Sequence, residues 1–327
     1  MRVLVTGSAG FVGSHLAEAL VAGGHDVVGL DAFVEYYPRA LKEANIAGLR
    51  AEPRFRLLEA DLRYDDLAPA LDGVEAVVHA AAMAGLPRSW TEFQTYMDCN
   101  LLGTQRLLDS ARSAGIGRFV HISTSSVYGR DAVGDESTPT RPISPYGVTK
   151  LAAENLVLAY VESFGFPATI LRYFSIFGPR QRPDMAYHIF IEALLDGRPI
   201  FVFGDGEQSR TNTFVGDAVT ATITAIEGGA IGEVYNIGGG EPITLNDAIR
   251  VIGAAVGVTP EIQYGPARVG DQRHTQADTT KARLAFGFRP TIGPSSGLRA
   301  QVDWQRALRT RSAAARSAVP QRRSADG

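Results

Sequence analysis

The stretch MRVLVTGSAGFVGSH, residues 1–15, decides how the rest of the chain is read. An apolar run at residues 3–5 predicts a buried strand, and the apolar spacing from Leu16 to Leu20 predicts a helix. Three glycines occupy the turn between them: Gly7, Gly10 and Gly13. Glycine permits unusual dihedral angles and a close backbone approach to phosphate, which the positive end of a helix attracts. The stretch therefore predicts a dinucleotide-binding turn; because the chain has 35 glycines, a purely structural turn is the alternative.

The composition is typical of a globular chain. The 327 residues are 45% hydrophobic and 20% charged, with a net charge of −3. The body lacks a basic cluster and an apolar run near the ~20 residues of a membrane helix, so we expect neither nucleic acid nor a membrane as a partner. Cys99 is the single cysteine and is expected in the core. Because the chain begins directly with a strand, we expect a cytoplasmic protein without a signal peptide.

Short apolar runs separated by helical patterns predict a parallel sheet covered on both faces. The runs are residues 3–6, 26–30, 55–60, 75–80, 118–123 and 168–173. Asp31 follows the second run, where a carboxylate can accept hydrogen bonds from ribose hydroxyls and would repel a 2′-phosphate. This favours NAD over NADP, although an ordinary aspartate at a strand end is the alternative.

Two further strand ends carry residues suited to a ligand. Asp61 and Leu62 follow the third run, where a side chain can reach an adenine. Small residues that let the backbone approach a ligand follow the fourth run: Ala80, Ala81 and Ala82. His79, directly before them, is expected to be a core histidine.

The regular rhythm stops after Tyr173, where residues 176–212 become rich in proline, glycine and aromatic side chains. We therefore expect an α/β fold, a Rossmann-type doubly wound parallel sheet with a smaller mixed α/β substrate lobe. The expected divisions are an NAD-binding domain at 1–175 with returning elements near 213–240, a substrate lobe mainly at 176–308, and a disordered tail at 311–327.

The pair Tyr146 and Lys150 is the strongest local signal for chemistry. On a helix, residues four apart share one face. An ammonium group there, like the positive charge of oxidised nicotinamide, favours a tyrosine phenolate and makes it usable as a base near neutral pH. A hydroxyl from the end of the fifth strand should complete the site, and we expect Thr124 to bond the reacting hydroxyl. Its neighbours Ser125 and Ser126 are further candidates; a run of hydroxyls that only caps a turn is the alternative.

Two long helical patterns, residues 89–114 and 144–164, predict a homodimer, because such helices commonly pair across a two-fold axis. Asn100 lies in the middle of the first pattern, on an otherwise apolar face. A buried polar side chain needs a partner, and the loop after the fifth strand is the candidate.

Several motifs occur in one order along residues 1–308: TGSAGFVG, the acid ending strand two, STSSVYG, YGVTK, LRYF, FGDG and Arg-x-Gly-Asp. Together they resemble the extended short-chain dehydrogenase/reductase family, specifically its nucleotide-sugar 4-epimerases. The resemblance implies tightly held NAD, a UDP-sugar substrate and no metal. It also implies that the tyrosine takes the proton of the sugar 4-hydroxyl while hydride passes to NAD, and that the 4-keto sugar turns over before hydride returns. The cofactor-binding residues so expected are Gly7, Gly10, Phe11, Val12, Gly13, Asp31, Asp61, Leu62, Ala80, Ala81, Ala82, Asn100, Tyr146, Lys150 and Tyr173.

The branch of the family depends on Ser125 and Ser126. Members that eliminate water carry an Asp-Glu pair there, and UDP-glucuronate decarboxylases carry a glutamate in place of Ser126. Because dehydration needs an acid and a base, their absence favours plain epimerisation. The reaction expected is UDP-glucuronate to UDP-galacturonate; the alternatives are a UDP-glucose/UDP-galactose 4-epimerase, a UDP-glucuronate decarboxylase and an NAD-bound regulatory protein.

The segments DAFVEYYPRALKEANI (31–46) and FGPRQRPDMA (177–186) resemble the UDP-glucuronate 4-epimerases. By that match Arg182 would face the sugar carboxylate, since its planar fork suits a planar anion. A surface or diphosphate-binding arginine is the alternative. Ser175 and the 124–126 hydroxyls would help to hold the carboxylate in an orientation that prevents decarboxylation of the 4-keto acid. Arg88 is also assigned to the substrate.

On the nucleotide side, the resemblance assigns Arg210 and Arg268 to the diphosphate and Asp271 to the ribose. Val202 and Phe203 would lie along the uracil, although a core position for Phe203 is an equal alternative.

Overall fold

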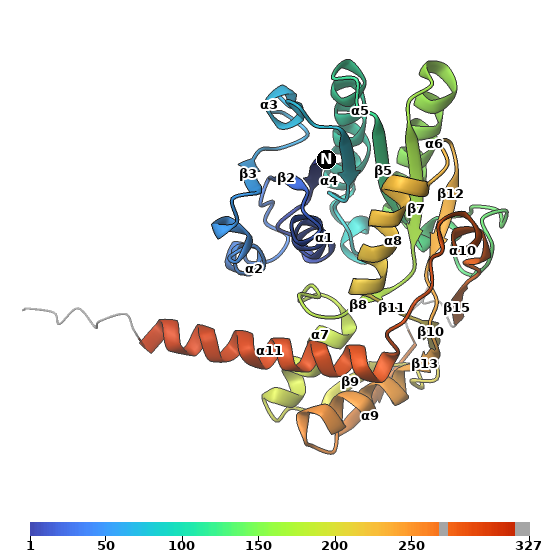
Figure 1. Ribbon diagram of the computed structural model, residues 1–327. Helices are drawn as coiled ribbons and strands as arrows, with labels where there is room; N and C mark the ends of the chain where they lie inside the picture. The colour runs from blue at the N-terminus through green and yellow to red at the C-terminus, as the bar shows by residue number, and fades with distance from the viewer. Residues whose placement is uncertain (268–273, 318–327) are drawn as a thin grey trace, which may run out of the picture.

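A seven-stranded parallel sheet forms the larger lobe of the computed structural model, which describes residues 1–267 and 274–317 (Figure 1). The strand order is β12-β7-β5-β4-β1-β2-β3. Their bounds are β1 Arg2–Thr6, β2 Asp26–Asp31, β3 Phe55–Glu59, β4 Ala76–His79, β5 Arg118–Thr124, β7 Ala168–Tyr173 and β12 Val234–Ile237. The order reverses between β1 and β4, and this reversal opens a crevice at the carboxyl ends of the strands. The predicted fold class is confirmed.

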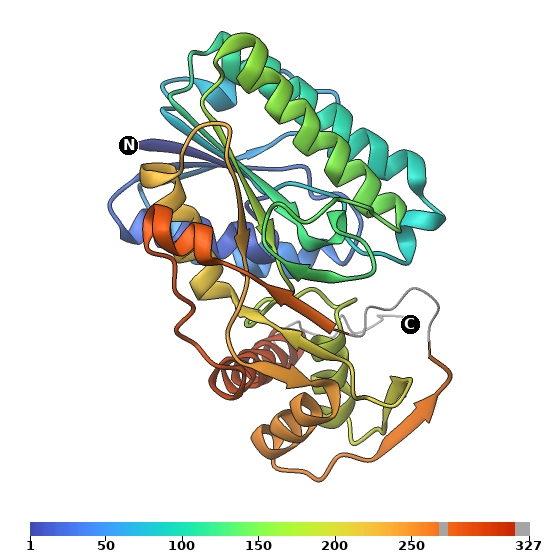
Figure 2. The same cartoon turned by 90° about the vertical axis from the view of Figure 1, so that its right-hand side faces the viewer.

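Helices cover both faces of this sheet. Apolar side chains of α1 (Phe11–Ala22), α8 (Val215–Gly228) and α10 (Thr280–Phe286) share a core with one face. Those of α3 (Ala68–Leu71), α5 (Gly103–Ser113) and α6 (Pro145–Phe164) share a core with the other. Figure 2 shows α5 and α6 lying side by side. The short elements α2 (Arg39–Asn45) and η1 (Leu49–Ala51) follow β2.

The sequence determines both ends of α6. Ser144 accepts a hydrogen bond from the Gly147 N–H, and Pro145 occupies the first turn, where its missing N–H costs nothing. Gly165 ends the helix in the left-handed conformation that glycine adopts without strain. The helix thus begins directly before Tyr146, which brings this side chain to the open end of the sheet.

The first long helical pattern is interrupted in the structure. It consists of η2 (Arg88–Trp90), α4 (Phe93–Met97), a π-helical turn at Asp98–Leu102 and α5. Asn100 lies in this turn, where its amide donates to the Met83 carbonyl and to Thr149 Oγ1 and accepts from the Met83 N–H. The partner of Asn100 is therefore the loop after β4 together with α6, rather than the loop after β5.

The smaller lobe combines short sheets and helices. A four-stranded sheet has the order β13-β10-β15-β6, and two-stranded pairs join β14 to β9 and β11 to β8. Their bounds are β6 Ala132–Gly134, β8 Ile176–Phe177, β9 Ile200–Phe203, β10 Ser209–Thr211, β11 Thr213–Phe214, β13 Pro242–Thr244, β14 Ile262–Gly265 and β15 His274–Ala277. Its core includes apolar side chains of α7 (Ala186–Leu195), α9 (Leu245–Val256) and α11 (Pro294–Ser317). Strand β6 comes from the first half of the chain, yet it pairs with β15.

The expected tail differs in part from the structure. Helix α11 continues to Ser317, so residues 311–317 are helical rather than without regular structure. This stretch consists of arginine, serine and alanine, and alanine and arginine have high helix propensity. The rest of the expected tail, 318–327, lies outside the described residues.

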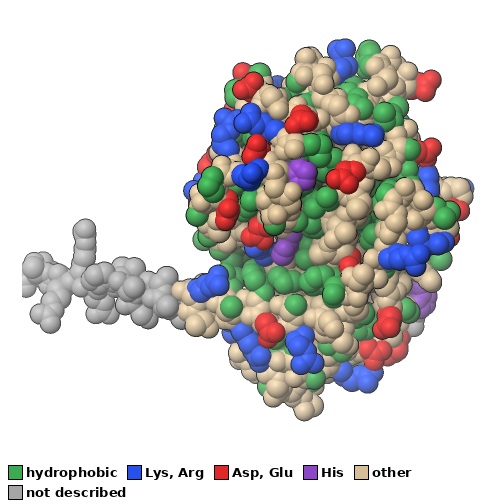
Figure 3. All heavy atoms as spheres, viewed as in Figure 1, with side chains coloured by type: hydrophobic (Ala, Val, Ile, Leu, Met, Phe, Trp, Pro, Cys, Tyr) green, Lys and Arg blue, Asp and Glu red, His purple; other side chains and the backbone are tan. Residues whose placement is uncertain are grey.

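Charges of both signs are interspersed over the face shown in Figure 3. Among the residues that the structure describes, none of the helices is long and apolar enough to cross a membrane.

Candidate active site

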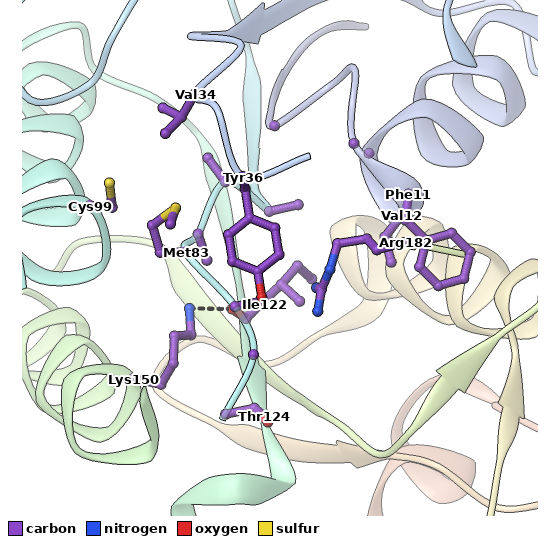
Figure 4. Close-up of a pocket in the computed structure, with 18 of the residues that line it drawn as sticks. Phe11, Val12, Val34, Tyr36, Met83, Cys99, Ile122, Thr124, Lys150 and Arg182 are labelled. Atoms are coloured by element: carbon purple, nitrogen blue, oxygen red, sulfur yellow. Dashed lines mark hydrogen bonds between the residues drawn. The ribbon is translucent and has the colours of Figure 1, made fainter. Parts of the chain in front are cut away.

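A cavity of about 470 Å³ lies at the carboxyl ends of the parallel strands (Figure 4). It collects residues that directly follow or end β1, β2, β3, β4, β5 and β7. The predicted site residues that line it are Gly7, Gly10, Phe11, Val12, Gly13, Asp31, Asp61, Leu62, Ala80, Ala81, Ala82, Thr124, Ser125, Ser126, Tyr146, Lys150, Tyr173, Ser175, Arg182 and Arg210. The fold therefore brings together segments that are far apart in the sequence.

The glycine turn forms one wall of the cavity and has no room for side chains. Gly7 has a φ of +70°, and a Cβ on it would lie 2.9 Å from the Ala81 Cα. A Cβ on Gly13 would lie 2.1 Å from the Gly7 carbonyl oxygen. Helix α1 begins directly after Gly10, its N-cap residue, which has no side chain to bond the first N–H groups. A helix N-terminus of this kind can bind an anion.

Asp31 is buried in the next wall and connects the glycine turn to Lys42. Its Oδ2 accepts a hydrogen bond from the Ala9 N–H at 3.1 Å, and its Oδ1 accepts one from the Phe33 N–H at 2.8 Å. Lys42 Nζ lies 3.4 Å from the same Oδ1 and also lines the cavity. Phe33 has a φ of 50°, which is uncommon for a bulky residue, and the hydrogen bond to Asp31 supports it there. The carboxylate is thus held rigidly at the cavity wall.

A second acid, Asp61, lines the cavity directly after β3. Burial by itself would raise the pKa of Asp61, but hydrogen bonds from the Arg63 guanidinium and backbone outweigh this and hold the pKa below its usual range. Cys99 also lines this region, so it is a cavity residue rather than the core residue expected. Burial raises the pKa of the Cys99 thiol to about 11, so the thiol stays protonated near neutral pH.

Tyr146 and Thr124 meet where α6 begins and β5 ends. Burial raises the pKa of the Tyr146 phenol, while a hydrogen bond with Thr124 and the positive charge of Arg182 act in the opposite direction. The sequence predicts Lys150 as the group that lowers this pKa; in the structure the opposing groups are Thr124 and Arg182. Thr124 also accepts a hydrogen bond from the Ser126 N–H at 3.2 Å, so it caps the following 3₁₀ turn as well as lining the cavity.

Lys150 reaches the cavity from α6 and is almost fully buried, at 2% exposure. Its Nζ donates to the Ile122 carbonyl at 2.8 Å, the interaction drawn dashed in Figure 4. Burial lowers the pKa of this ammonium to about 8, and the carboxylate of Glu154 on the next helical turn opposes the change.

Arg182 extends into the cavity from the smaller lobe, on the opposite side from Lys150 in Figure 4. Its Nε and Nη2 donate to the two carboxylate oxygens of Asp184, at 2.9 and 3.0 Å. The Tyr36 hydroxyl donates to the same carboxylate at 3.0 Å. These contacts join the loop after β8 to the loop after β2, so the two lobes close over one end of the cavity.

The family model described as "NAD dependent epimerase/dehydratase family" matches residues 3–238. The chain is 41% identical over 313 residues to the uncharacterized UDP-glucose epimerase YtcB of Bacillus subtilis, with 94% of this chain and 99% of that protein covered. The chain belongs to the NAD-dependent epimerase/dehydratase family.

Solved structures in the comparison have the same fold over nearly the whole chain. The UDP-glucuronic acid 4-epimerase of Bacillus cereus, in complex with UDP-glucuronic acid and NAD, is 41% identical, with a TM-score of 0.91 and coverage of 94% and 100%. MoeE5 in complex with UDP-glucuronic acid and NAD is 39% identical, with a TM-score of 0.84 and the same coverage. A second MoeE5 structure holds UDP-glucose and NAD.

Two residues that were expected to bind a ligand, Asn100 and Arg88, contact other protein groups and do not line the cavity. Asn100 bonds to Met83 and Thr149 and so supports the cavity wall from behind. Arg88 pairs with Glu92, and its guanidinium lies 4.7 Å from the centre of the Tyr36 ring, so it holds Tyr36 rather than lining the cavity. Asn100 is buried behind the cavity wall, whereas the Arg88 side chain is partly exposed on the outer side of Tyr36.

The expected uracil contacts also differ. Val202 is 1% exposed and belongs to the core of the smaller lobe, because its side chain points to the covered face of β9. Phe203 lies at the end of β9 with its ring centre 4.9 Å from that of Phe201, outside the cavity lining. Arg268 and Asp271 lie outside the described residues.

The sequence analysis missed several cavity residues of this family member: Tyr36, Tyr37, Lys42, Arg63 and Met83. The first three come from the segment DAFVEYYPRALKEANI, whose likeness to the UDP-glucuronate 4-epimerases was the available signal. Arg63 and Met83 follow strands β3 and β4, so their position after a strand end was a second signal. His79 is buried with both ring nitrogens hydrogen-bonded, to Thr6 and Thr104, which confirms the prediction of a core histidine.

Proposed function

We propose that this chain is an NAD-dependent UDP-sugar 4-epimerase that converts UDP-glucuronate to UDP-galacturonate. Family membership and its likeness to the Bacillus cereus 4-epimerase support the reaction. The observation that carries the choice of an acidic sugar is Arg182, a cavity arginine whose charge acts on Tyr146.

The cavity suits NAD at its glycine-turn end. At Gly7 and Gly13 a Cβ would collide with neighbouring backbone, so only glycine allows this tight turn, and its backbone would lie against a pyrophosphate at the start of α1. Asp31 and Lys42 would hold the adenosine ribose, and Asp61 and Leu62 would lie beside the adenine. When bound, NAD supplies the capacity to accept hydride from the sugar and to return it.

The chain's own residues perform the proton chemistry. Tyr146, as phenolate, removes the proton of the sugar 4-hydroxyl, and Thr124 donates a hydrogen bond that orients this hydroxyl. The 4-keto sugar then presents its other face, and Tyr146 returns the proton to the oxygen. Lys150 provides a positive charge close to this region. Ser125 and Ser126 stand where an elimination would need carboxylates, which supports epimerisation over dehydration.

Arg182 gives the acidic sugar its partner and limits a side reaction. A 4-keto glucuronate is a β-keto acid, which loses carbon dioxide when the breaking bond aligns with the carbonyl. Arg182 uses Nε and Nη2 for Asp184, and its remaining N–H groups would bind the sugar carboxylate. Ser175, which lines the cavity with a φ of 28°, would hold the other carboxylate oxygen.

A neutral-sugar 4-epimerase, acting on UDP-glucose and UDP-galactose, is the second candidate. The bidentate pair of Arg182 with Asp184 favours it, because the arginine charge is already compensated within the protein. Arg210 lines the same cavity and would bind the diphosphate of either sugar nucleotide. We assign Arg268 and Asp271 to the diphosphate and ribose on sequence grounds alone.

We also propose a homodimer. Exposed apolar side chains occur along the segment from η2 to α5 and on α6: Trp90, Phe93, Leu102, Val148 and Phe164. A second copy of the same surface would bury them around a two-fold axis. Sedimentation should give twice the mass of the chain, and Leu102→Glu should give the single-chain mass. A cytoplasmic location stays a prediction from the sequence.

One experiment tests the proposed reaction. The purified chain is incubated separately with UDP-glucuronate and UDP-glucose, and the products are separated by chromatography and weighed by mass spectrometry. We expect a product of unchanged mass and new retention time from UDP-glucuronate. Such a product from UDP-glucose alone would select the second candidate, and a product that has lost carbon dioxide would identify a decarboxylase.

A further inference from the structure

His121 is a buried histidine beside Lys150 that the proposed reaction does not use. It lies on β5, is 0% exposed, and its Nε2 is 3.3 Å from Lys150 Nζ. Its Nδ1 has no hydrogen-bond partner among the described residues. Buried polar atoms are almost always satisfied, so an orphaned nitrogen here requires an explanation.

The position of His121 follows from the strand and helix periods. Residues two apart on a strand face the same side, and residues four apart on a helix share one face. His121 and Ser123 on β5 accordingly face α6, where they contact Lys150 and Glu154, respectively. Lys150 and Ser123 line the cavity, whereas His121 and Glu154 lie behind them, so His121 can act on Lys150 without touching a ligand.

Burial and the surrounding charges determine the protonation state of His121. Lys150 and Glu154 face it from α6, His79 from β4 at a ring-centre distance of 5.3 Å, and Arg172 of β7 pairs with Glu154. Burial, and then the charge of Lys150, hold the pKa of His121 well below its usual value. A neutral imidazole that faces an ammonium group must present a lone pair to it, so the ring proton lies on Nδ1.

We propose that His121 is a positioning residue for Lys150: its Nε2 accepts one N–H of the ammonium, the Ile122 carbonyl accepts a second, and the third points into the cavity. An ammonium group has three donors, so two fixed acceptors determine the direction of the remaining one. A neutral imidazole carries one ring proton, so when Nε2 accepts a hydrogen bond the proton lies on Nδ1, which has no acceptor among the described residues. This role concerns the lysine alone and is the same whichever sugar the cavity binds.

The tautomer can be measured in the unaltered protein. Nitrogen-15 NMR of histidine-labelled protein distinguishes a protonated from an unprotonated ring nitrogen, and loss of the signals in His121→Gln assigns them. We expect His121 to be neutral, with the proton on Nδ1, at all pH values where the protein is folded. A proton on Nε2, or a charged ring at neutral pH, would overturn the proposal, and this readout needs neither NAD nor turnover.

Two substitutions at the same position test the effect on Lys150. Glutamine places an amide oxygen close to the site of Nε2, whereas leucine of similar volume has no acceptor. Removing an acceptor disfavours the charged lysine, so in His121→Leu the high-pH limb of kcat/KM should move down by about one pH unit. In His121→Gln it should move by only a few tenths of a unit. Equal shifts in the two variants would show a merely structural role.

His79→Leu is the matched control, because His79 is equally buried on the neighbouring strand, paired in register with His121, and bonds to threonines rather than to Lys150. His79→Leu should lower the thermal midpoint of unfolding but leave the high-pH limb of the kcat/KM profile unchanged. A limb shift in His79→Leu as large as that in His121→Leu would overturn the proposal. If the leucine variants do not fold, the tautomer measurement still decides.

Discussion

The two ends of the cavity are built in different ways. The glycine-turn end consists of backbone and very small side chains, such as Gly7, Gly13 and Ala81, packed so closely that a Cβ has no room. The other end consists of long side chains from loops, with Arg182, Asp184 and Tyr36 joined by hydrogen bonds. At the first end the backbone recognises the ligand, so a change of specificity there requires a change of backbone conformation. At the second end side chains recognise the ligand, so a single substitution can change the specificity.

Tyr146 is the base of the proposed reaction, so its loss should have the largest effect. Tyr146→Phe removes the hydroxyl that acts as base in the proposed reaction and should lower kcat by roughly 10³-fold, with little change in KM. Steady-state kinetics with UDP-glucuronate measures this. Tyr64→Phe, at an exposed position, is the control and should be fully active. A Tyr146→Phe enzyme within tenfold of the original rate would remove the tyrosine from the mechanism.

The backbone end is tested by Gly13→Ala. The added Cβ would lie 2.1 Å from the Gly7 carbonyl oxygen, so the turn must shift. Overpacking of this kind costs about 2 kcal/mol, and we expect NAD binding to weaken by roughly 30-fold in calorimetry.

Gly48→Ala is the control for this change. A Cβ there meets nothing within 4 Å, and the residue has helical dihedral angles. Because alanine lowers the entropy of the unfolded chain, the thermal midpoint should stay equal or rise, with NAD affinity unchanged. If Gly13→Ala binds NAD as tightly as Gly48→Ala, the turn is not packed against the cofactor.

The side-chain end is tested by Arg182→Met. Loss of a charged donor should reduce the preference for UDP-glucuronate over UDP-glucose by about tenfold and raise the fraction of turnover that ends in lost carbon dioxide. Arg198→Met is the control, because Arg198 pairs with Asp196 at the same two-residue spacing on the surface. An unchanged sugar preference in Arg182→Met would transfer carboxylate recognition to another residue.

The smallest effect is a pH dependence from Lys150, whose pKa burial lowers to about 8. Activity that needs the ammonium should therefore fall as the pH rises through about 8. The stability should change in the opposite direction, because between this value and the ordinary lysine pKa the unfolded chain binds more protons than the folded one. The free energy of unfolding should therefore rise with pH across this window, more steeply in the original protein than in Lys150→Met.

The contrast between the two ends also explains what the sequence could predict. The strands, the glycine turn, Asp31 and the Tyr146–Lys150 pair depend on local spacing and on the rule that parallel strands end at one edge. The bond between Tyr36 and Asp184 joins residues 148 positions apart, and local patterns carry no information on such a contact. Asn100 was predicted to need a polar partner, but the partner lies on the loop after β4 and on α6 rather than on the loop after β5. Val202 is an apolar residue of the core, and its local sequence does not distinguish a core position from a ligand contact.

Strand β6 has a consequence for engineering. The segment Ala132–Gly134 lies between Thr124 and Tyr146 in the chain, yet it completes the smaller lobe by pairing with β15. Asn236 of the larger sheet bonds to the Gly134 carbonyl and, through its N–H, to Glu136. A chimera that grafts a relative's sugar lobe at residue 176 would therefore separate β6 from its sheet. A successful exchange has to transfer residues 130–144 together with the lobe.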